Sequence, residues 1–180
     1  MKTIALFGGS FDPPHVGHEA VVNALQKLTY IDQVVVMPTF LNPFKSKAHA
    51  SSELRLKWLK CIFSDNKRVV IDSYEVRQEK KVPSIESVLY LLQKYDKIFL
   101  VIGADNLKTL KTWHRYDELK GYVSFIVASR EDIEIPKEFT EIRVDEDISS
   151  STLRKAIDKT KLTKECAEEI AQYYKETDAK

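Results

Sequence analysis

Two histidines in a glycine-rich turn are the strongest sign of chemistry in this sequence. His15 and His18 follow Gly8 and Gly9, and the glycine pair comes directly after the apolar run 4–7. A strand that ends in two glycines exposes backbone N–H groups where no side chain blocks an approaching phosphate. Histidines three residues apart share one face of a helix. We therefore expect this turn to bind nucleotide phosphates.

Two other uses of the histidines stay open at this point. They could cap a helix or pack in the core, although two imidazoles beside a turn rich in glycine and proline are uncommon in that use. They could also bind a metal together with Asp12, but the sequence offers no convincing further ligands. The turn also lacks the Gly-Lys-Ser/Thr ending of a P-loop and the G-x-G-x-x-G spacing of a dinucleotide site.

A second polar cluster lies near the other end of the chain. Ser149 and Ser150 open a helical pattern, and Arg154 follows one turn later. Serine hydroxyls and N–H groups at the start of a helix favour anions, and arginine binds phosphate oxygens through several N–H groups. An ordinary serine N-cap would explain the same serines. The cluster is a candidate for the other half of a phosphate site.

Further candidates lie in two loops near the middle of the chain. Gly103 would let a nucleoside approach the backbone closely, and Asp105 could accept a hydrogen bond from a ribose hydroxyl. Trp113 could stack on an aromatic ring, although tryptophan is more often a core residue. Lys45 could neutralise phosphate charge, or it could be an ordinary solvated lysine.

Strand-like and helix-like patterns alternate through the whole chain, and these elements must position the candidate residues. We predict strands over residues 3–7, 33–37, 68–76, 97–102, 122–128 and 141–144. We predict helices over 16–28, from about 52, over 84–95, in short pieces over 105–119, and from about 150 and 163. Strands separated by helices imply an α/β fold, with a mostly parallel sheet and helices on both faces. Ligands of such sheets bind at the carboxyl ends of the strands, where loops 8–18, 39–47 and 103–105 fall.

The composition is typical of an ordinary soluble protein. The 180 residues fit a single domain, 1–180, with no linker and with the helices from about 150 included in it. The net charge of +1 gives no reason to expect nucleic acid as a partner. No apolar stretch approaches the roughly 18 residues of a membrane span, and the N-terminus does not resemble a signal peptide. We expect a cytoplasmic location and no membrane association, and an oligomer is compatible with the sequence.

The chain has two cysteines, Cys61 and Cys166, and neither supports a catalytic hypothesis. They lie far apart in the sequence, without the spacing of metal ligands, and each falls in a helical pattern. We expect reduced, structural thiols at both positions.

Three motifs resemble those of a known enzyme family. GGSFDPPHVGH at 8–18 resembles the H-x-G-H signature of nucleotidyltransferases related to class I aminoacyl-tRNA synthetases, and in this form it is similar to bacterial nicotinate-nucleotide adenylyltransferases. ISSSTLR at 148–154 resembles the family's I-S-S-T-x-I-R, with Ser151 for threonine and Leu153 for isoleucine. GADNLKTLKTW at 103–113 resembles G-A-D-x-x-x-x-L-x-x-W. The resemblance extends from residue 2 to about 174 and implies a Rossmann-like fold.

Two segments depart from the family pattern. Pro83 and Ser84 match the start of the family's P-S-Y-T, but Ile and Glu replace its last two residues. Residues 37–45 differ from M-P-N-x-x-P-P-H-K: Lys45 is retained, Thr39 replaces the asparagine and Phe44 replaces the histidine. We therefore keep Lys45 as a site candidate and exclude Phe44.

The resemblance implies an adenylyltransferase of NAD biosynthesis. Such an enzyme joins ATP and nicotinate mononucleotide to give nicotinate adenine dinucleotide and pyrophosphate, usually with Mg²⁺ and without metal ligands from the protein. The implied catalytic residues are His15, His18 and Arg154. The implied ATP-binding residues are Gly8, Gly9, Ser10, Phe11, Lys45, Gly103, Asp105, Ser149 and Ser150, and the implied mononucleotide-binding residues are Ser84 and Trp113. The alternatives are a related transferase that uses nicotinamide mononucleotide or phosphopantetheine as acceptor, and a nucleotide-binding protein without activity.

Overall fold

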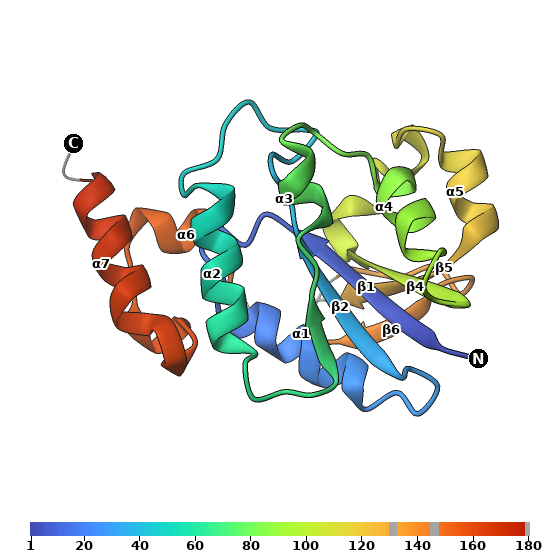
Figure 1. The fold of residues 1–180 in the computed structure, drawn as a ribbon, viewed down its shortest axis with the longest axis horizontal. Coiled ribbons are helices and arrows are strands. Elements are labelled where there is room, and N and C mark those ends of the chain that lie inside the picture. The colour runs from blue at the N-terminus through green and yellow to red at the C-terminus, as the bar shows by residue number, and fades with distance from the viewer. Residues whose placement is uncertain (130–132, 145–147, 179–180) are drawn as a thin grey trace.

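The computed structural model describes residues 1–129, 133–144 and 148–178, and its centre is a parallel sheet (Figure 1). The six strands have the order β3-β2-β1-β4-β5-β6, and every neighbouring pair is parallel. Their bounds are β1 (Thr3–Gly9), β2 (Gln33–Pro38), β3 (Val69–Ile71), β4 (Lys97–Gly103), β5 (Val123–Ser129) and β6 (Thr140–Arg143). The predicted parallel α/β sheet is confirmed.

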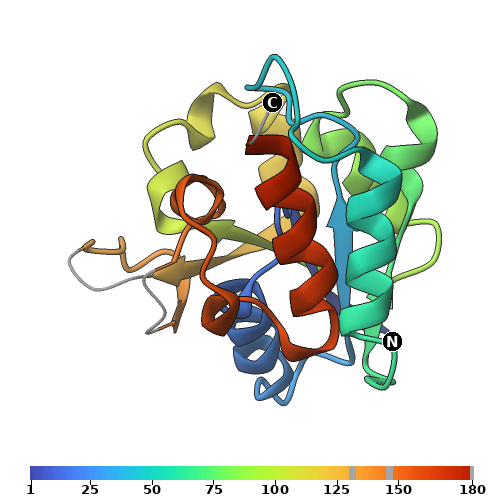
Figure 2. The same ribbon diagram turned by 90° about the vertical axis from the view of Figure 1, so that its left-hand side faces the viewer.

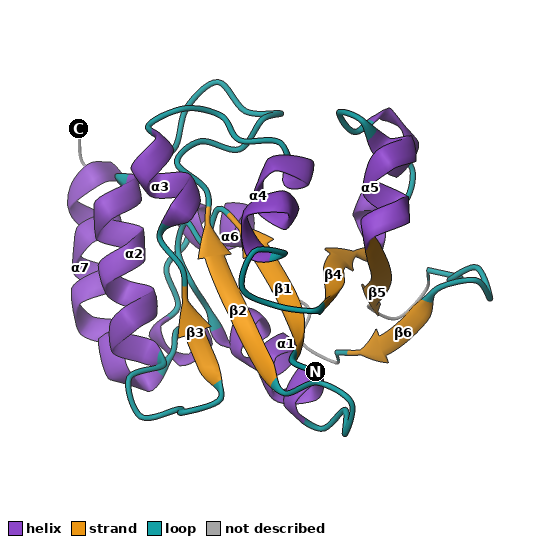
Figure 3. Cartoon of the chain, turned by 45° about the vertical axis from the view of Figure 1, so that its right-hand side comes forward, coloured by secondary structure: helices purple, strands orange, loops and turns teal. Residues whose placement is uncertain are grey.

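Helices cover both faces of this sheet (Figure 3). The α-helices are α1 (Val16–Gln26), α2 (Ser52–Ile62), α3 (Tyr74–Gln78), α4 (Ser84–Leu91), α5 (Tyr116–Tyr122), α6 (Ser150–Lys155) and α7 (Ala167–Asp178). Short 3-10 helices are η1 (Ala104–Asn106), η2 (Leu110–Thr112), η3 (Lys159–Lys161) and η4 (Lys164–Cys166). None of the helices in the described parts of the chain is long and apolar enough to span a membrane.

The central strands contribute to two hydrophobic cores, one on each face. In β1, Ala5 packs in the core that α1, α2 and α7 share, whereas Ile4 and Leu6 pack in the core that includes α4 and α5. Successive side chains of a strand point to opposite faces, so a strand buried on both sides is a continuous apolar run. This explains why the predicted strands 3–7 and 97–102 lie at the centre of the sheet.

One predicted strand is wrong in its second half. The pattern over 68–76 predicts one strand, but the structure has β3 only to Ile71 and then begins α3 at Tyr74. The carboxylate of Asp72 accepts a hydrogen bond from the Tyr74 N–H at 2.8 Å. Such a local turn ends a strand, although apolar residues continue to alternate beyond it.

The expectation of two separate thiols is also wrong. Cys61 on α2 and Cys166 in η4 form a disulfide, with their Cα atoms 6.9 Å apart. The two residues are 105 positions apart, and only the packing of η4 against α2 brings them together. Helices α2 and α7 also lie side by side (Figures 1 and 2). The C-terminal part of the chain therefore covers the face of the sheet that carries α2.

The strand order reverses direction at β1. Strands β2 and β3 follow on one side of β1, and β4, β5 and β6 follow on the other. Open α/β sheets bind ligands in the crevice beyond the carboxyl ends of the strands at such a reversal. The segments after β1, β2 and β4 begin at this edge, so the fold directs the three predicted loops to one place.

Candidate active site

A cavity of about 890 Å³ lies at this edge of the sheet. All of the predicted site residues except Arg154 line it. They are Gly8, Gly9, Ser10, Phe11, His15, His18, Lys45, Ser84, Gly103, Asp105, Trp113, Ser149 and Ser150. The same cavity is thus lined by predicted residues that are distant in the sequence.

The two histidines stack on each other at the start of α1. Their ring centroids are 3.7 Å apart with 25° between the planes. His15 is the N-cap, and its Nδ1 accepts a hydrogen bond from the Gly17 N–H at 3.0 Å. The Nδ1 of His18 accepts one from the His15 N–H at 3.1 Å. A neutral imidazole that accepts at Nδ1 carries its proton on Nε2, so each ring has Nε2–H as its donor.

This arrangement joins two uses of the histidines that the sequence left as alternatives. Both rings cap α1 through Nδ1, and both line the cavity. Capping fixes the tautomer and the orientation of each ring. The histidines are therefore held rigidly in a form that can donate to a phosphate oxygen.

The turn before the histidines has an unusual backbone. Phe11 has φ of 50°, in the left-handed region, and its side chain is buried. Its ring meets the rings of Phe7 and His18 edge-on, with centroids 5.4 Å and 4.8 Å away. A Cβ at Gly9 would lie 3.2 Å from the Phe11 ring. The aromatic contacts stabilise the bend, and a side chain at position 9 would push the Phe11 ring away by a few tenths of an ångström.

Asp12 anchors this turn to two distant segments. Its buried carboxylate accepts hydrogen bonds from the N–H groups of His49 and Ala50 at 2.7 and 3.0 Å, and from the hydroxyl of Tyr174 on α7. Burial and the nearby Asp12 charge raise the pKa of Tyr174, so its hydroxyl stays a donor. The carboxylate that could have been a metal ligand is thus engaged with the protein itself.

Arg55 makes a second anchor, which the sequence did not indicate. It lies on α2 with 0% of its surface exposed. Its guanidinium donates to the carbonyls of Ala50, Ser10 and Phe40 at 3.1, 2.6 and 3.0 Å. A planar group with several donors can bridge separate loops in this way. The sequence carries no signal for this role, because a single arginine in an amphipathic helix normally faces solvent.

The second predicted cluster docks onto the backbone of the first. Arg154 donates from Nη1 to the carbonyl of Asp12 at 2.6 Å, and Ser150 donates to the carbonyl of Pro13 at 2.9 Å. Ser149 is the N-cap of α6 and accepts from the Thr152 N–H at 3.2 Å. The serines line the cavity, whereas Arg154 does not.

Lys45 brings a cation to the cavity from the loop after β2. The loop turns at Asn42, which accepts from the N–H groups of Phe44 and Lys45 at 2.8 and 2.9 Å. Partial burial and, next, the charge of Arg154 lower the pKa of Lys45. An anion between the two cations would relieve this repulsion. Phe44, excluded by the sequence reasoning, also lines the cavity, with 70% of its surface exposed.

The loop after β4 provides the remaining predicted groups. A Cβ at Gly103 would lie 2.6 Å from Oδ1 of Asp105, so only glycine leaves that carboxylate where it is. Trp113 packs against the core that contains α4 and also lines the cavity. Trp113 thus has a core position and a place at the cavity wall, and stacking on a ligand ring stays a prediction.

Two further polar residues were missed. Among the described residues that line the cavity, the buried side-chain atoms without a hydrogen-bond partner are Nε1 of Trp113, Oγ1 of Thr39 and Oε2 of Glu75. Buried polar atoms are nearly always paired in proteins, and ligands are one way to pair them. The false strand over 68–76 concealed Glu75, which the structure places on α3 instead.

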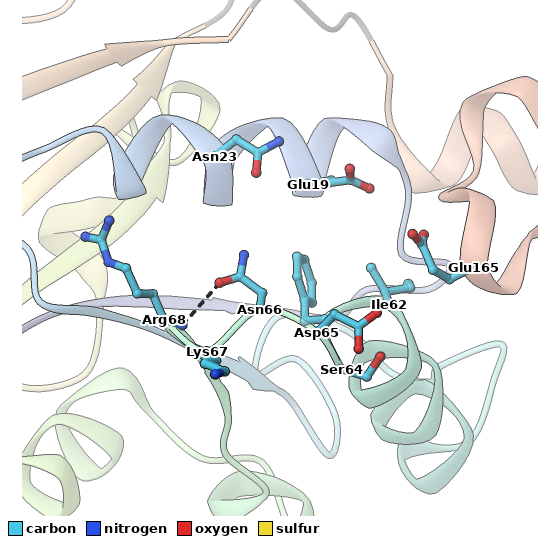
Figure 4. Close-up of a pocket in the computed structure, with 10 residues that line it drawn as sticks. Glu19, Asn23, Ile62, Ser64, Asp65, Asn66, Lys67, Arg68 and Glu165 are labelled. Atoms are coloured by element: carbon cyan, nitrogen blue, oxygen red, sulfur yellow. Dashed lines mark hydrogen bonds between the residues drawn. The ribbon is translucent and has the colours of Figure 1, made fainter.

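A second cavity, of about 480 Å³, lies elsewhere between α1, the end of α2 and η4 (Figure 4). Glu19, Asp65 and Glu165 line it, and burial and then the charge of Glu165 raise the pKa of Glu19. None of the predicted site residues lines this cavity. The cavity at the carboxyl edge of the sheet is therefore the candidate active site.

Relatives with curated descriptions match almost the whole chain. A Sulfurimonas denitrificans protein named "Probable nicotinate-nucleotide adenylyltransferase" is 58% identical over 100% of this chain and 99% of its own length. Proteins of the same name from Nitratiruptor and Campylobacter jejuni are 49% and 45% identical, over 96% and 95% of this chain and 98% and 96% of their own lengths.

Solved structures agree in fold. The Plasmodium falciparum nicotinic acid mononucleotide adenylyltransferase complexed with NaAD has a TM-score of 0.77 at 21% identity, over 99% of this chain and 98% of that one. The same enzyme complexed with APC has a TM-score of 0.71 at 19% identity, over 99% of this chain and 96% of that one. The Cytidylyltransferase-like family matches residues 6–156. The chain belongs to this family and, within it, to the nicotinate-nucleotide adenylyltransferases.

Proposed function

We propose that this enzyme transfers the adenylyl group of ATP to nicotinate mononucleotide and so produces nicotinate adenine dinucleotide for NAD biosynthesis. The observation that carries the proposal is the stacked pair His15 and His18, whose donors are fixed at Nε2 in a cavity with the other predicted residues. The names of the relatives support the choice of acceptor.

The reaction needs no nucleophilic side chain. An oxygen of the mononucleotide 5′-phosphate attacks the α-phosphorus of ATP in line with the leaving group, and a new P–O bond forms. The bond between the α-phosphorus and the bridging oxygen breaks, and pyrophosphate leaves with the electron pair. The attacking phosphate is already anionic, so the protein contributes positioning and charge stabilisation.

Each group near the phosphates has a distinct role in this proposal. Nε2–H of His15 donates to the α-phosphate, and Nε2–H of His18 donates to the departing phosphates. Backbone N–H groups of 9–11 and the ammonium of Lys45 complete the phosphate site. Arg154 acts as a positioning residue, because its guanidinium holds the carbonyl of Asp12 directly before the histidine turn.

The adenosine and the pyridine ring are assigned to different residues of the cavity. We place the adenosine at Gly103 and Asp105, and the pyridine ring of the acceptor at Ser84 and Trp113, which all line the cavity. Mg²⁺ enters with ATP as part of the substrate, with triphosphate oxygens and water as its ligands. Asp12 is not assigned to the metal, because its carboxylate accepts two backbone N–H groups.

We also propose that residues 1–180 form one nucleotidyltransferase domain that works in the cytoplasm on small-molecule substrates. Contacts of α6 and α7 with the rest of the chain support the single domain, since Ile170 and Leu153 pack in the same core as α1 and α2. Cys61 and Cys166 form a disulfide, and neither residue lines the active-site cavity.

Steady-state kinetics test the proposed function directly. Pyrophosphate release is measured with ATP and Mg²⁺ and with nicotinate mononucleotide, nicotinamide mononucleotide or phosphopantetheine as acceptor. We expect the highest kcat/KM with nicotinate mononucleotide. Turnover with phosphopantetheine instead, or ATP binding without turnover, would identify one of the two alternative functions and overturn the proposal.

A further inference from the structure

Glu75 on α3 is a buried carboxyl group at the wall of the active-site cavity, and the phosphate chemistry does not use it. Only 7% of the residue is exposed. Ser87 donates to its Oε1 at 2.6 Å, whereas Oε2 is buried without any hydrogen-bond partner. Leaving such an oxygen unpaired costs about 1–3 kcal/mol. A bound ligand would supply the missing partner.

The hydrogen bond to Ser87 places Glu75 beside the first turn of α4. Ser84 begins that helix and Ser87 lies one turn later. Pro83 is the N-cap and provides no side-chain hydrogen bond, so the first N–H groups have no capping side chain. The start of a helix favours a negative group. Pro83, Ser84 and Glu75 all line the cavity, where the acceptor is proposed to bind.

We propose that Oε2 of Glu75 hydrogen-bonds with the substituent on the pyridine ring of the acceptor, and thereby selects a carboxylate over a carboxamide. This inference rests on the proposed function, because it concerns the same acceptor site. In its protonated form, Glu75 donates from Oε2 to a carboxylate oxygen, which is a strong charge-assisted hydrogen bond. In its ionised form, it repels a carboxylate and accepts from the N–H of a carboxamide.

Its surroundings favour the protonated form. Burial raises the pKa of Glu75 to about 7, the hydrogen bond from Ser87 opposes this rise, and the charge of Glu86 on α4 adds to it. The proton resides on Oε2, because Oε1 already accepts from Ser87.

The nearby cations are engaged with other groups, and Lys80 pairs with Glu86 at 3.3 Å. Arg77, also on α3, donates to the hydroxyl of Tyr90 at 3.4 Å. Arg55 on α2 donates to three backbone carbonyls. Strand β2, which packs against α3, contains no charged residue. A substrate carboxylate beside Glu75 would therefore stabilise the proton further.

The proposal predicts opposite pH trends for the two pyridine mononucleotides. Between pH 6 and 8.5, KM for nicotinate mononucleotide should rise as Glu75 loses its proton, and KM for nicotinamide mononucleotide should not rise with it. Both substrates carry the same 5′-phosphate, so titration of that phosphate cancels in the ratio of their kcat/KM values. The ratio isolates the group that faces the pyridine substituent.

Three variants test this assignment. Glu75→Gln keeps an N–H donor in place of the carboxyl proton. The ratio of the two kcat/KM values should therefore favour nicotinate mononucleotide and should no longer depend on pH. Glu75→Ala removes the donor and should lower kcat/KM for nicotinate mononucleotide about 10–100-fold, mainly through KM. Glu86→Gln is the matched control: it removes a neighbouring charge and keeps Glu75, so the pH trend should persist with its midpoint at a lower pH. Thermal melts check that each variant is folded.

Calorimetry provides a second readout that does not depend on turnover. At pH 8, binding of nicotinate mononucleotide to the wild-type protein should take up a proton, seen as a binding enthalpy that varies with the ionisation enthalpy of the buffer. Binding of nicotinate mononucleotide to Glu75→Gln should be accompanied by less proton uptake. The inference is overturned if the wild-type enzyme uses nicotinate mononucleotide but Glu75→Gln keeps the same pH-dependent ratio and the same proton uptake. If the wild-type enzyme adenylylates neither mononucleotide, the proposed function itself fails.

Discussion

Each histidine of the candidate active site can use both of its ring nitrogens. Nδ1 accepts a backbone N–H at the start of α1, so Nε2 carries the proton, and both residues line the cavity. An imidazole can serve structure and chemistry at once because its two nitrogens lie on opposite sides of the ring. A suitable substitution can therefore remove the Nε2 donor and still keep the helix cap that Nδ1 provides.

Replacing His15 by Asn separates the two roles. The Asn side-chain oxygen can accept the Gly17 N–H, and Asn is a favourable N-cap, so the melting temperature should stay close to that of the wild type. The Nε2 donor is lost, and kcat should fall about 10²–10³-fold. His15→Ala should lose about 1 kcal/mol of stability in addition. Near-wild-type pyrophosphate release by His15→Asn would contradict the catalytic role.

Glu75 makes folding stability depend on pH in a defined direction. The folded protein holds the Glu75 proton up to a pKa of about 7, whereas the ordinary value is 4.5. Between these values the folded state binds more protons than the unfolded state, so this contribution is present at low pH and is lost as pH rises through about 7. From pH 4.5 to 8, wild type should lose up to about 3 kcal/mol relative to Glu75→Gln. Urea unfolding at pH 5 and pH 8 measures the free energy of unfolding of wild type and of Glu75→Gln. If the two proteins differed by the same free energy at both pH values, Glu75 would not be the source of the pH dependence.

At the scale of elements, the loops of the site depend on helix α2. Arg55 connects α2 to the turn after β1 and to the loop after β2 through the carbonyls of Ser10 and Phe40. The loops of the proposed phosphate site are thus held by Arg55, which does not itself line the cavity. Strain at Phe11 and the exposure of the loop after β2 make such an anchor necessary.

Removing this anchor should loosen the loops. Arg55→Met keeps the volume of the side chain but leaves one buried and two partly buried carbonyls without their donor, which should cost about 3 kcal/mol in total. We expect a melting temperature lower by about 6–12 °C and a higher KM for ATP. Lys57→Met, a nearby α2 lysine that pairs with Glu169 at the surface, is the control and should change little. Equal stability of Arg55→Met and the control would contradict the role of Arg55.

At the scale of the whole molecule, the C-terminal helix is connected to the histidine turn. Tyr174 on α7 donates to Asp12, which also accepts from Ala50 before α2. The first loop, the second loop and the last helix therefore meet at one buried carboxylate. The position of α7 beside α2 (Figure 2) makes this contact, and it couples the end of the chain to the site.

Tyr174→Phe tests this coupling. The substitution removes one donor to a buried carboxylate and should cost about 1–3 kcal/mol in the free energy of unfolding. It should also lower kcat, because the segment between Asp12 and His15 is less firmly held. Tyr173→Phe removes an exposed hydroxyl that donates to the His49 carbonyl at 3.1 Å, and serves as the control. If both variants matched the wild type in denaturant unfolding and in turnover, the coupling would be refuted.

Much of the fold and of the candidate site could be predicted from the sequence. Apolar runs such as 3–7 indicated the central strands, and the glycine, histidine and serine motifs fell at the carboxyl ends of strands or at the starts of helices. In a parallel sheet these ends share one edge, so the alternation of strands and helices predicted that the loops at Gly8 and Gly103 would lie at the same edge. These features depend on neighbours within a few residues, which a sequence displays directly.

Only the tertiary structure decided how the glycine and histidine turn is held. The bonds from Arg55 to Ser10, from Tyr174 to Asp12 and from Arg154 to Asp12 join residues 45, 162 and 142 positions apart. The pairing of Cys61 with Cys166, and the burial of Glu75, arise from the same packing. Such contacts depend on which helix faces lie together in space, and the periodicity of a single chain does not encode this. The sequence by itself determined the parallel sheet and the residues that meet at its edge, and the packing determined which of them face the cavity and which hold the others in place.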